Sequence, residues 1–189
     1  MTYGDGDGRA FRAFSSALDV VGHELTHGVI TNTSALEYKN QSGALNEAIA
    51  DVFGALIEHY YKDDAATNWV MGDKIALGTE GRRDYIHPRS GGQPSNMREY
   101  LQLAPDEDNG GVHMNSGIVN NAFYLMTMGG TNDVSQTKVE KGIGWDKAGK
   151  LWYRANANYI LKTSNFAAAA QGTLSAAKDI GLSQNETNI

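Results

Sequence analysis

The chain has 189 residues, of which 20% are charged, and its formal net charge at pH 7 is −6. An acidic chain without a basic stripe is not typical of nucleic-acid-binding proteins, so this class of partner is excluded. Because the sequence has no cysteine, it also excludes disulfides, thiolate metal sites and cysteine nucleophiles. It has no run of about 18 or more apolar residues, so we expect no membrane-spanning segment and no membrane partner.

Hydrophobic periodicity predicts a mainly α-helical protein. The glycine-rich opening, residues 4–8, is expected to be a loop, and a helix over residues 18–30 follows, with Ser15 or Ser16 available to cap it. A second strong helix is predicted over residues 44–61. Residues 62–111 contain all three prolines and should form loops with short helical turns. Three more helices are predicted over residues 116–128, over residues 147–161, and after Ser164-Asn165 through the alanine-rich run 167–170.

The first predicted helix carries the motif His23-Glu24-Leu25-Thr26-His27. Residues at positions i and i+4 of a helix lie on one face, one turn apart. Two imidazoles at this spacing can bind one zinc ion, and Glu24 is then placed to act as general base on a zinc-activated water. The competing interpretation is a surface helix with two solvated histidines.

The second predicted helix supplies a third ligand of the right kind. A catalytic zinc ion needs three protein ligands and an open position, and Glu47 can complete a site of two histidines and one glutamate. Asp51 follows at i+4 and can accept the free ring N–H of a ligand histidine, and we expect Asn46 to support the ligands as well. An acidic stripe on a solvated face fits poorly, because the neighbouring positions are mostly apolar and buried carboxylates are expected to be paired or metal-bound.

These segments resemble the thermolysin family of neutral metalloproteases, and the match runs nearly end to end in the same order. The shared segments are Tyr3-Gly4-Asp5-Gly6-Asp7-Gly8, Asp19-Val20-Val21-Gly22-His23-Glu24-Leu25-Thr26-His27, Ser42-Gly43-Ala44-Leu45-Asn46-Glu47-Ala48, Asp51-Val52-Phe53-Gly54, Asn109-Gly110-Gly111-Val112-His113, Asn115-Ser116-Gly117-Ile118 and Thr163-Ser164-Asn165-Phe166.

The resemblance implies a fold of the helical zincin type. Residues 1–31 would be the end of the N-terminal domain with the zinc-binding helix, and residues 32–189 the C-terminal helical domain. Nearly all of the family's β-rich N-terminal domain would lie outside this chain. Whether the helical domain continues past residue 189 is left open.

The resemblance also implies a zinc endopeptidase and assigns roles around the metal. Tyr38 and His113 would donate hydrogen bonds to the oxyanion of the reaction, and Asp108 would orient His113 across the tight turn Asn109-Gly110-Gly111. Arg83 would bind a substrate carbonyl oxygen, with its neighbour Arg82 as the alternative in a different register.

Family specificity favours large apolar residues on the leaving-group side of the cleaved bond. The matching pocket positions are Phe11, Phe14 and Val20, which could instead be plain core residues. Protein or peptide substrates, and the family's own N-terminal domain or propeptide, are the implied partners. The implied location is extracellular, after secretion.

Calcium is the second metal that the resemblance implies. Asp19, Glu58, Asn68 and Asp73 fall on the family's calcium-binding positions, and hard oxygen ligands suit this ion. The family's paired site has a further acidic residue where this chain has Val70, and an aspartate where it has Asn68. We therefore expect one structural calcium ion instead of two.

Two alternatives to an active endopeptidase stay open. The first is a metal-binding fragment that is inactive without a complementary N-terminal domain. The second, weaker one is an aminopeptidase of the wider group that shares the two-histidine motif. The sequence has no recognisable amine-anchoring motif, and residues 46–51 favour the thermolysin family.

Overall fold

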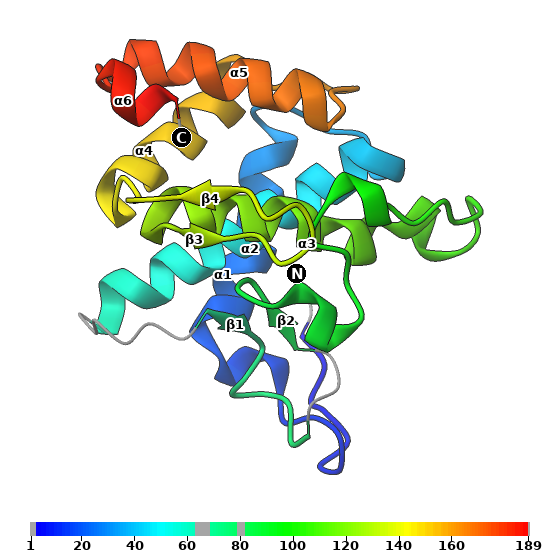
Figure 1. The fold of residues 1–189 in the computed structure, drawn as a ribbon. Coiled ribbons are helices and arrows are strands. Elements are labelled where there is room, and N and C mark those ends of the chain that lie inside the picture. Colours follow the sequence, from blue (N-terminus) through cyan, green and yellow to red (C-terminus); the bar gives the residue numbers. More distant parts are fainter. Residues whose placement is uncertain (1–2, 63–68, 79–81, 189) are drawn as a thin grey trace.

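The computed structural model describes residues 3–62, 69–78 and 82–188 (Figure 1). Its α-helices are α1 (Leu18–Thr31), α2 (Asn40–Lys62), α3 (Asp108–Met128), α4 (Trp145–Asn158), α5 (Phe166–Asp179) and α6 (Gln184–Thr187). Three 3-10 helices are η1 (Phe14–Ser16), η2 (Pro88–Gly91) and η3 (Met97–Glu99). Strands β1 (Val70–Met71) and β2 (Arg83–Asp84) form one antiparallel pair, and β3 (Gly130–Thr131) and β4 (Lys138–Val139) form another.

Helix α2 is the central element. It packs against α1, α3, α4 and α5, and every residue from 42 to 52 is buried. A helix that is buried on all sides must be apolar on all sides or have its polar groups satisfied. Most of this stretch is apolar, and its exceptions include Asn46, Glu47 and Asp51. Their partners therefore determine what this part of the molecule does.

Helices α1 and α2 approach each other closely enough to bring their side chains to one point. At Gly54, an added Cβ atom would lie 2.4 Å from the backbone oxygen of Asp19, so only glycine fits there. On the other side of α2, the core is closed by an aromatic cluster in which Trp69 stacks on Trp145 and both rings contact Phe123. Helix α2 thus packs against α1 and α3.

The mainly helical prediction is confirmed, with several differences in detail. Ser15 and Ser16 lie in η1 instead of capping α1, whose N-cap position is Ala17 and has no side-chain cap. The Ser16 hydroxyl donates to the backbone oxygen of Ala13. Helix α2 begins at Asn40, four residues before its predicted start. The residues of its first turn are mostly polar, so hydrophobic periodicity did not indicate this boundary. The two-residue strands and the single turn α6 were not predicted.

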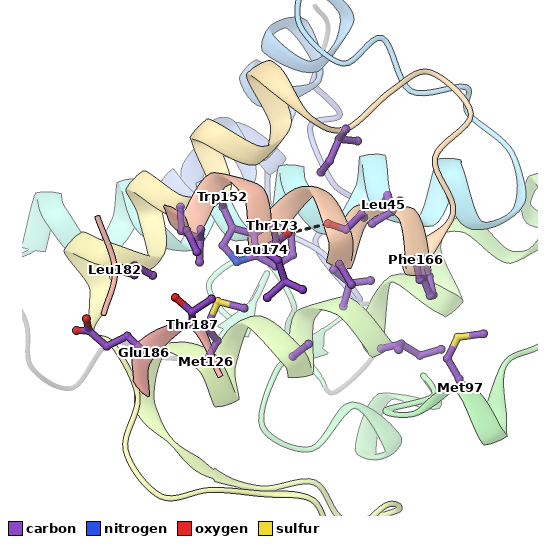
Figure 2. A pocket seen from close by; sticks show the side chains of 18 residues that line it. Leu45, Met97, Met126, Trp152, Phe166, Thr173, Leu174, Leu182, Glu186 and Thr187 are labelled. Atoms are coloured by element: carbon purple, nitrogen blue, oxygen red, sulfur yellow. Dashed lines mark hydrogen bonds between the residues drawn. The ribbon is translucent and has the colours of Figure 1, made fainter. Parts of the chain in front are cut away.

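An apolar pocket of about 350 Å³ lies between α3, α4 and α5 (Figure 2). Its walls include Leu45, Met126, Trp152, Phe166 and Leu174. None of the residues that the sequence proposes as metal ligands lines it. Among the described residues, no helix is long and apolar enough to cross a bilayer.

Candidate metal centre

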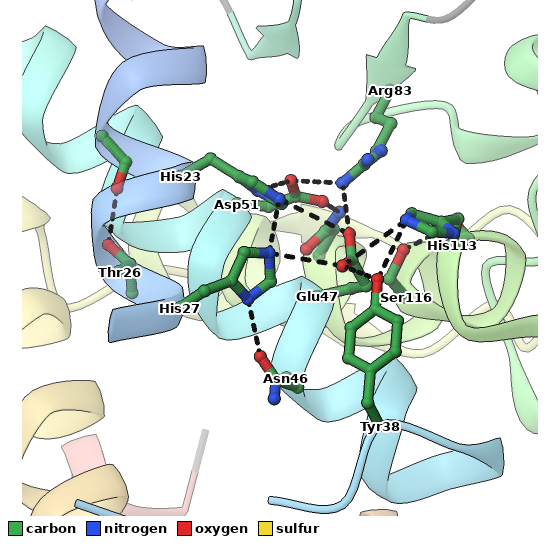
Figure 3. Close-up of polar contacts among 12 residues, drawn as sticks. His23, Thr26, His27, Tyr38, Asn46, Glu47, Asp51, Arg83, His113 and Ser116 are labelled. Atoms are coloured by element: carbon green, nitrogen blue, oxygen red, sulfur yellow. Dashed lines mark hydrogen bonds and ion pairs between the residues drawn. The ribbon is translucent and has the colours of Figure 1, made fainter. Parts of the chain in front are cut away.

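Three side chains from α1 and α2 converge on one point (Figure 3). Nε2 of His23 lies 3.0 Å from Nε2 of His27 and 3.5 Å from Oε2 of Glu47, and Nε2 of His27 lies 3.4 Å from Oε1 of Glu47. A zinc ion bound tetrahedrally at about 2.0–2.1 Å separates neighbouring ligand atoms by about 3.3–3.4 Å. In the part of the chain that the structure describes, this is the only such group of histidine and carboxylate ligands. The three residues therefore fit zinc.

The far sides of both imidazoles fix which nitrogen faces the metal. Asn46 Nδ2 donates to the backbone oxygen of Leu36, so its Oδ1 faces His27 Nδ1 at 2.8 Å and can only accept. His23 Nδ1 lies 2.8 Å from the carboxylate oxygen Oδ1 of Asp51. The neutral ring of His27 therefore carries its proton on Nδ1, and the Nε2 atoms of both rings face the same space, 3.0 Å apart. Such an arrangement is unfavourable without a cation and suits a metal ion.

The negative charge of Glu47 favours a cation between the three side chains. Burial opposes ionisation of Glu47, yet the hydrogen bond with His27 and the charge of Arg83 hold the pKa of Glu47 well below its usual value. Burial lowers the pKa of His27, but Glu47 outweighs this effect and the pKa of His27 lies above its usual value. Glu47 is therefore a carboxylate at neutral pH, and a proton competes with metal at His27 as the pH falls.

Tyr38 and His113 stand at the open side of the centre. The Tyr38 hydroxyl donates to Oε1 of Glu47 and lies 3.1 Å from Nε2 of His113. Burial and the nearby charge of Glu47 raise the pKa of Tyr38, so the hydroxyl keeps its proton. The side chains of Tyr38 and His113 are 41% and 47% exposed, whereas Glu47 is 1% exposed. The metal position is thus enclosed by protein on one side and open to a substrate on the other.

A glycine turn places His113 against Asp108, as the sequence predicts. Residues Asp108 to Gly111 all have positive φ, which the two glycines adopt without strain. The chain then turns back into α3, and Asp108 accepts from the backbone N–H of His113 at 2.9 Å while its other oxygen lies 2.5 Å from His113 Nδ1. The carboxylate therefore fixes the orientation of the His113 ring.

Arg83, on β2, is the arginine that reaches the centre. Its Nη1 lies 2.5 Å from Oδ1 of Asp51 and 3.2 Å from Oε2 of Glu47. Arg82 instead donates from Nη2 to the backbone oxygen of Ala76. The contacts therefore favour the register with Arg83 at the metal side.

Asn120 is a residue of the centre that sequence reasoning missed. Its Nδ2 donates to Oδ2 of Asp51 at 2.8 Å, and both side chains are fully buried. One oxygen of Asp51 therefore accepts a hydrogen bond from Asn120. Its other oxygen lies beside His23 Nδ1 and Arg83 Nη1. The only sequence signal was a pair of asparagines in the otherwise largely apolar stretch of α3.

The remaining proposed active-site residues lie near the start of the chain. Glu24 follows His23 on α1 and is half-buried, and its carboxylate makes no hydrogen bond or ion pair with any described residue. Phe11 and Phe14 pack on each other with ring centroids 5.7 Å apart, and Val20 belongs to the hydrophobic core. The core interpretation thus holds for Val20, and the substrate-pocket role of all three stays a prediction.

The residues expected to bind calcium do not gather into a metal-ligand group among the described residues, and calcium binding stays a prediction. Asp19 accepts from two backbone N–H groups, of Val20 at 2.9 Å and Gly72 at 2.8 Å. The Glu58 carboxylate is paired with the ammonium group of Lys74, a contact that was not predicted from the sequence. Asn68 lies outside the described residues, and Asp73 lies in the turn after β1. A lysine in contact with one of the carboxylates does not fit calcium.

Comparisons with known proteins agree with the geometry of the centre. Residues 34–189 match the family model described as "Thermolysin metallopeptidase, alpha-helical domain", and residues 1–31 match "Thermolysin metallopeptidase, catalytic domain".

Curated relatives match over most or all of the chain. It is 43% identical to a thermolysin of Alicyclobacillus acidocaldarius subsp. acidocaldarius over 100% of its own length and 34% of that protein. It is 44% identical to a bacillolysin of Bacillus cereus, with 95% of the chain and 31% of the relative covered. The precursor of protealysin, a metalloproteinase from Serratia proteamaculans, is a similar solved structure. It has a TM-score of 0.79 and 37% identity, with 97% of this chain and 58% of that one covered. The chain thus spans about a third of the length of the first of these relatives.

Proposed function

Because the chain belongs to the thermolysin metallopeptidase family, we propose that it is the metal-binding part of a zinc endopeptidase. The observation that carries this proposal is the convergence of His23, His27 and Glu47 at tetrahedral spacing on a half-open site. The proposed reaction is hydrolysis of peptide bonds on the amino side of large hydrophobic residues. It is proposed for the whole protein, since the chain spans 34% of a curated relative.

Glu24 is the proposed general base. Zinc at this centre would acidify a water molecule towards neutral pH and polarise the peptide carbonyl group. Glu24 would accept the proton of the attacking water and deliver it to the leaving amine. In support, its carboxylate has no hydrogen-bond or ion-pair partner among the described residues and adjoins the ligand His23.

His113 and Tyr38 are the proposed donors to the developing oxyanion. Asp108 holds Nδ1 of His113, which leaves Nε2 of the ring directed to the open side of the centre. This Nε2 and the Tyr38 hydroxyl lie on the exposed side, where a substrate carbonyl would arrive. Donors fixed in place before the reaction stabilise the transition state without reorganisation.

Arg83 is the proposed contact of a substrate carbonyl oxygen beside the cleaved bond. Among the described residues, only its Nη1 hydrogen-bonds to protein acceptors, so Nε and Nη2 keep N–H groups for a ligand. Asp51 and Glu47 hold the guanidinium group in position. Phe11, Phe14 and Val20 remain the proposed pocket for the apolar side chain, and secretion remains the proposed localisation.

The alternative is a metal-binding fragment that needs an N-terminal domain for activity. Leu25 and Val29, on α1, are 56% and 43% exposed and form an apolar strip on the helix that carries the ligands. Such a strip suits a contact with another domain. The calcium ion that the resemblance implies is not part of this proposal, because the ammonium group of Lys74 is the cation beside Glu58.

The test is hydrolysis of a blocked peptide with Leu or Phe on the leaving-group side by the zinc-loaded chain. Glu24→Gln is the matched control, since it removes the base and keeps all three ligands. The proposal expects cleavage that is lost in the control and in a zinc chelator. Zinc binding without cleavage would favour the fragment alternative, and cleavage by Glu24→Gln at the parent rate would contradict the assigned base.

A further inference from the structure

Two buried carboxylates lie where α1 begins and α2 approaches its end. Asp19 is in the first turn of α1 and Glu58 is in the last turns of α2, and they are 2% and 3% exposed. The turn after β1 passes beside them, and its Gly72 N–H donates to Oδ2 of Asp19 at 2.8 Å. Carboxylates buried this deeply require a compensating positive charge or several hydrogen bonds.

The structure provides positive charge from within the chain. The ammonium group of Lys74, in the same turn, forms an ion pair with Oε1 of Glu58. The Lys74 side chain is 36% exposed, so its stem reaches in from the surface while Glu58 stays buried. The pair joins residues 16 positions apart and fastens the turn to α2.

The carboxylates of Asp19 and Glu58 already have partners within the chain. Calcium takes about six to eight oxygen ligands, mostly carboxylates, carbonyls and water. Both oxygens of Asp19 accept backbone N–H groups, an ammonium group contacts Glu58, and Val70 offers only hydrocarbon. A calcium ion next to Glu58 would also be repelled by the lysine charge.

We infer that the ammonium group of Lys74 replaces a structural calcium ion at this junction, so that the fold is stable without calcium. A lysine is tethered to the chain and cannot dissociate when the calcium concentration falls. The junction of α1, α2 and the turn would then be independent of the calcium supply. This inference concerns stability and does not rest on the proposed peptidase activity.

The first test uses the unmodified, zinc-loaded chain. Calcium is titrated by calorimetry, and terbium is titrated by luminescence excited through tryptophan, since Trp69 precedes β1. At about 5 mM calcium, a ligand that binds the native state tightly would raise Tm by several degrees, whereas the inference expects a shift below about 1 °C. One bound calcium or terbium ion per chain, with a Kd below about 100 µM and a clear rise in Tm, would overturn the inference.

The second test removes the ammonium group. Lys74→Met keeps the length of the side chain and leaves Glu58 without this partner, so we expect Tm in calcium-free buffer to fall by several degrees. Lys147→Met is the matched control, because Lys147 pairs with Glu186, whose side chain is 27% exposed against 4% for Glu58. Exposed ion pairs contribute little, so the control should shift Tm less. A Tm equal to that of the parent in Lys74→Met would contradict the inference, and if this variant does not fold, the calcium titration of the unmodified chain decides.

Discussion

Replacing Asn120 with leucine should weaken zinc binding although Asn120 is not a ligand. Its Nδ2 donates to Oδ2 of Asp51 at 2.8 Å, and the other oxygen of Asp51 lies 2.8 Å from Nδ1 of the ligand His23. Leucine has a similar volume, so the main change is the loss of one hydrogen bond. Asp51 could then rotate away from His23, which would lose its fixed orientation.

The magnitude follows from the buried charge. A hydrogen bond to a charged group contributes about 1.5–3 kcal/mol, and removing one partner leaves the carboxylate oxygen of Asp51 unsatisfied. Residues that orient metal ligands typically change metal affinity by about 10–100-fold when they are replaced. We therefore expect the zinc Kd of Asn120→Leu to rise by about 10–100-fold. The assay is competition for zinc with a chromophoric chelator.

Asn156→Leu separates this effect from a general loss of stability. Asn156 is also buried, but its side chain bonds Thr33 and Ser34, beyond the end of α1. The Asn156→Leu variant should therefore have a lower Tm and an unchanged zinc Kd. Parent-like zinc affinity in folded Asn120→Leu, or an equal loss in both variants, would refute the positioning role of Asn120.

Two further predictions concern the open side of the centre and the end of the chain. His113→Ala should lower kcat of the active protein by about 10²–10³-fold with unchanged zinc content, because His113 is a donor and not a ligand; loss of zinc from this variant would argue against that role. The ammonium group of Lys147 and the cap Ser183 lower the pKa of Glu186 from its usual 4.5 to about 2. Because a depressed carboxyl pKa stabilises the fold above the unfolded pKa, Glu186→Gln should lower Tm at neutral pH. The difference should shrink as the pH falls from about 4.5 and vanish near pH 2, and a difference in Tm that is unchanged across this range would contradict the assignment.

The sequence predicted best what is local along the chain. The spacing of His23 and His27 fixes their common face, and the turn before His113 returns the chain to Asp108 within five residues. The predicted helices exist because their apolar positions recur at helical spacing over several turns. Short segments lack such a signal, so the two-residue strands and α6 were missed.

Contacts between segments that are distant in the sequence could not be predicted from local sequence patterns. Asn120 and Asp51 are 69 residues apart, and only the packing of α3 on α2 brings them together. The contact of Lys74 with Glu58 depends on how the turn after β1 folds back on α2, and residues between them contribute no periodic pattern. The family resemblance points to the acidic residues, and nothing local in the sequence places Lys74 beside Glu58.

The most direct test of the metal centre is to measure the zinc content of the purified chain and the X-ray absorption spectrum of its zinc. The geometry predicts one zinc ion per chain, with two imidazole nitrogens and carboxylate oxygen at about 2.0–2.2 Å. Glu47→Ala should lose the carboxylate and most of the bound zinc, whereas Glu24→Gln should keep both. A parent chain that binds no zinc, or a ligand set that is unchanged in Glu47→Ala, would contradict the assignment of His23, His27 and Glu47 as the metal centre.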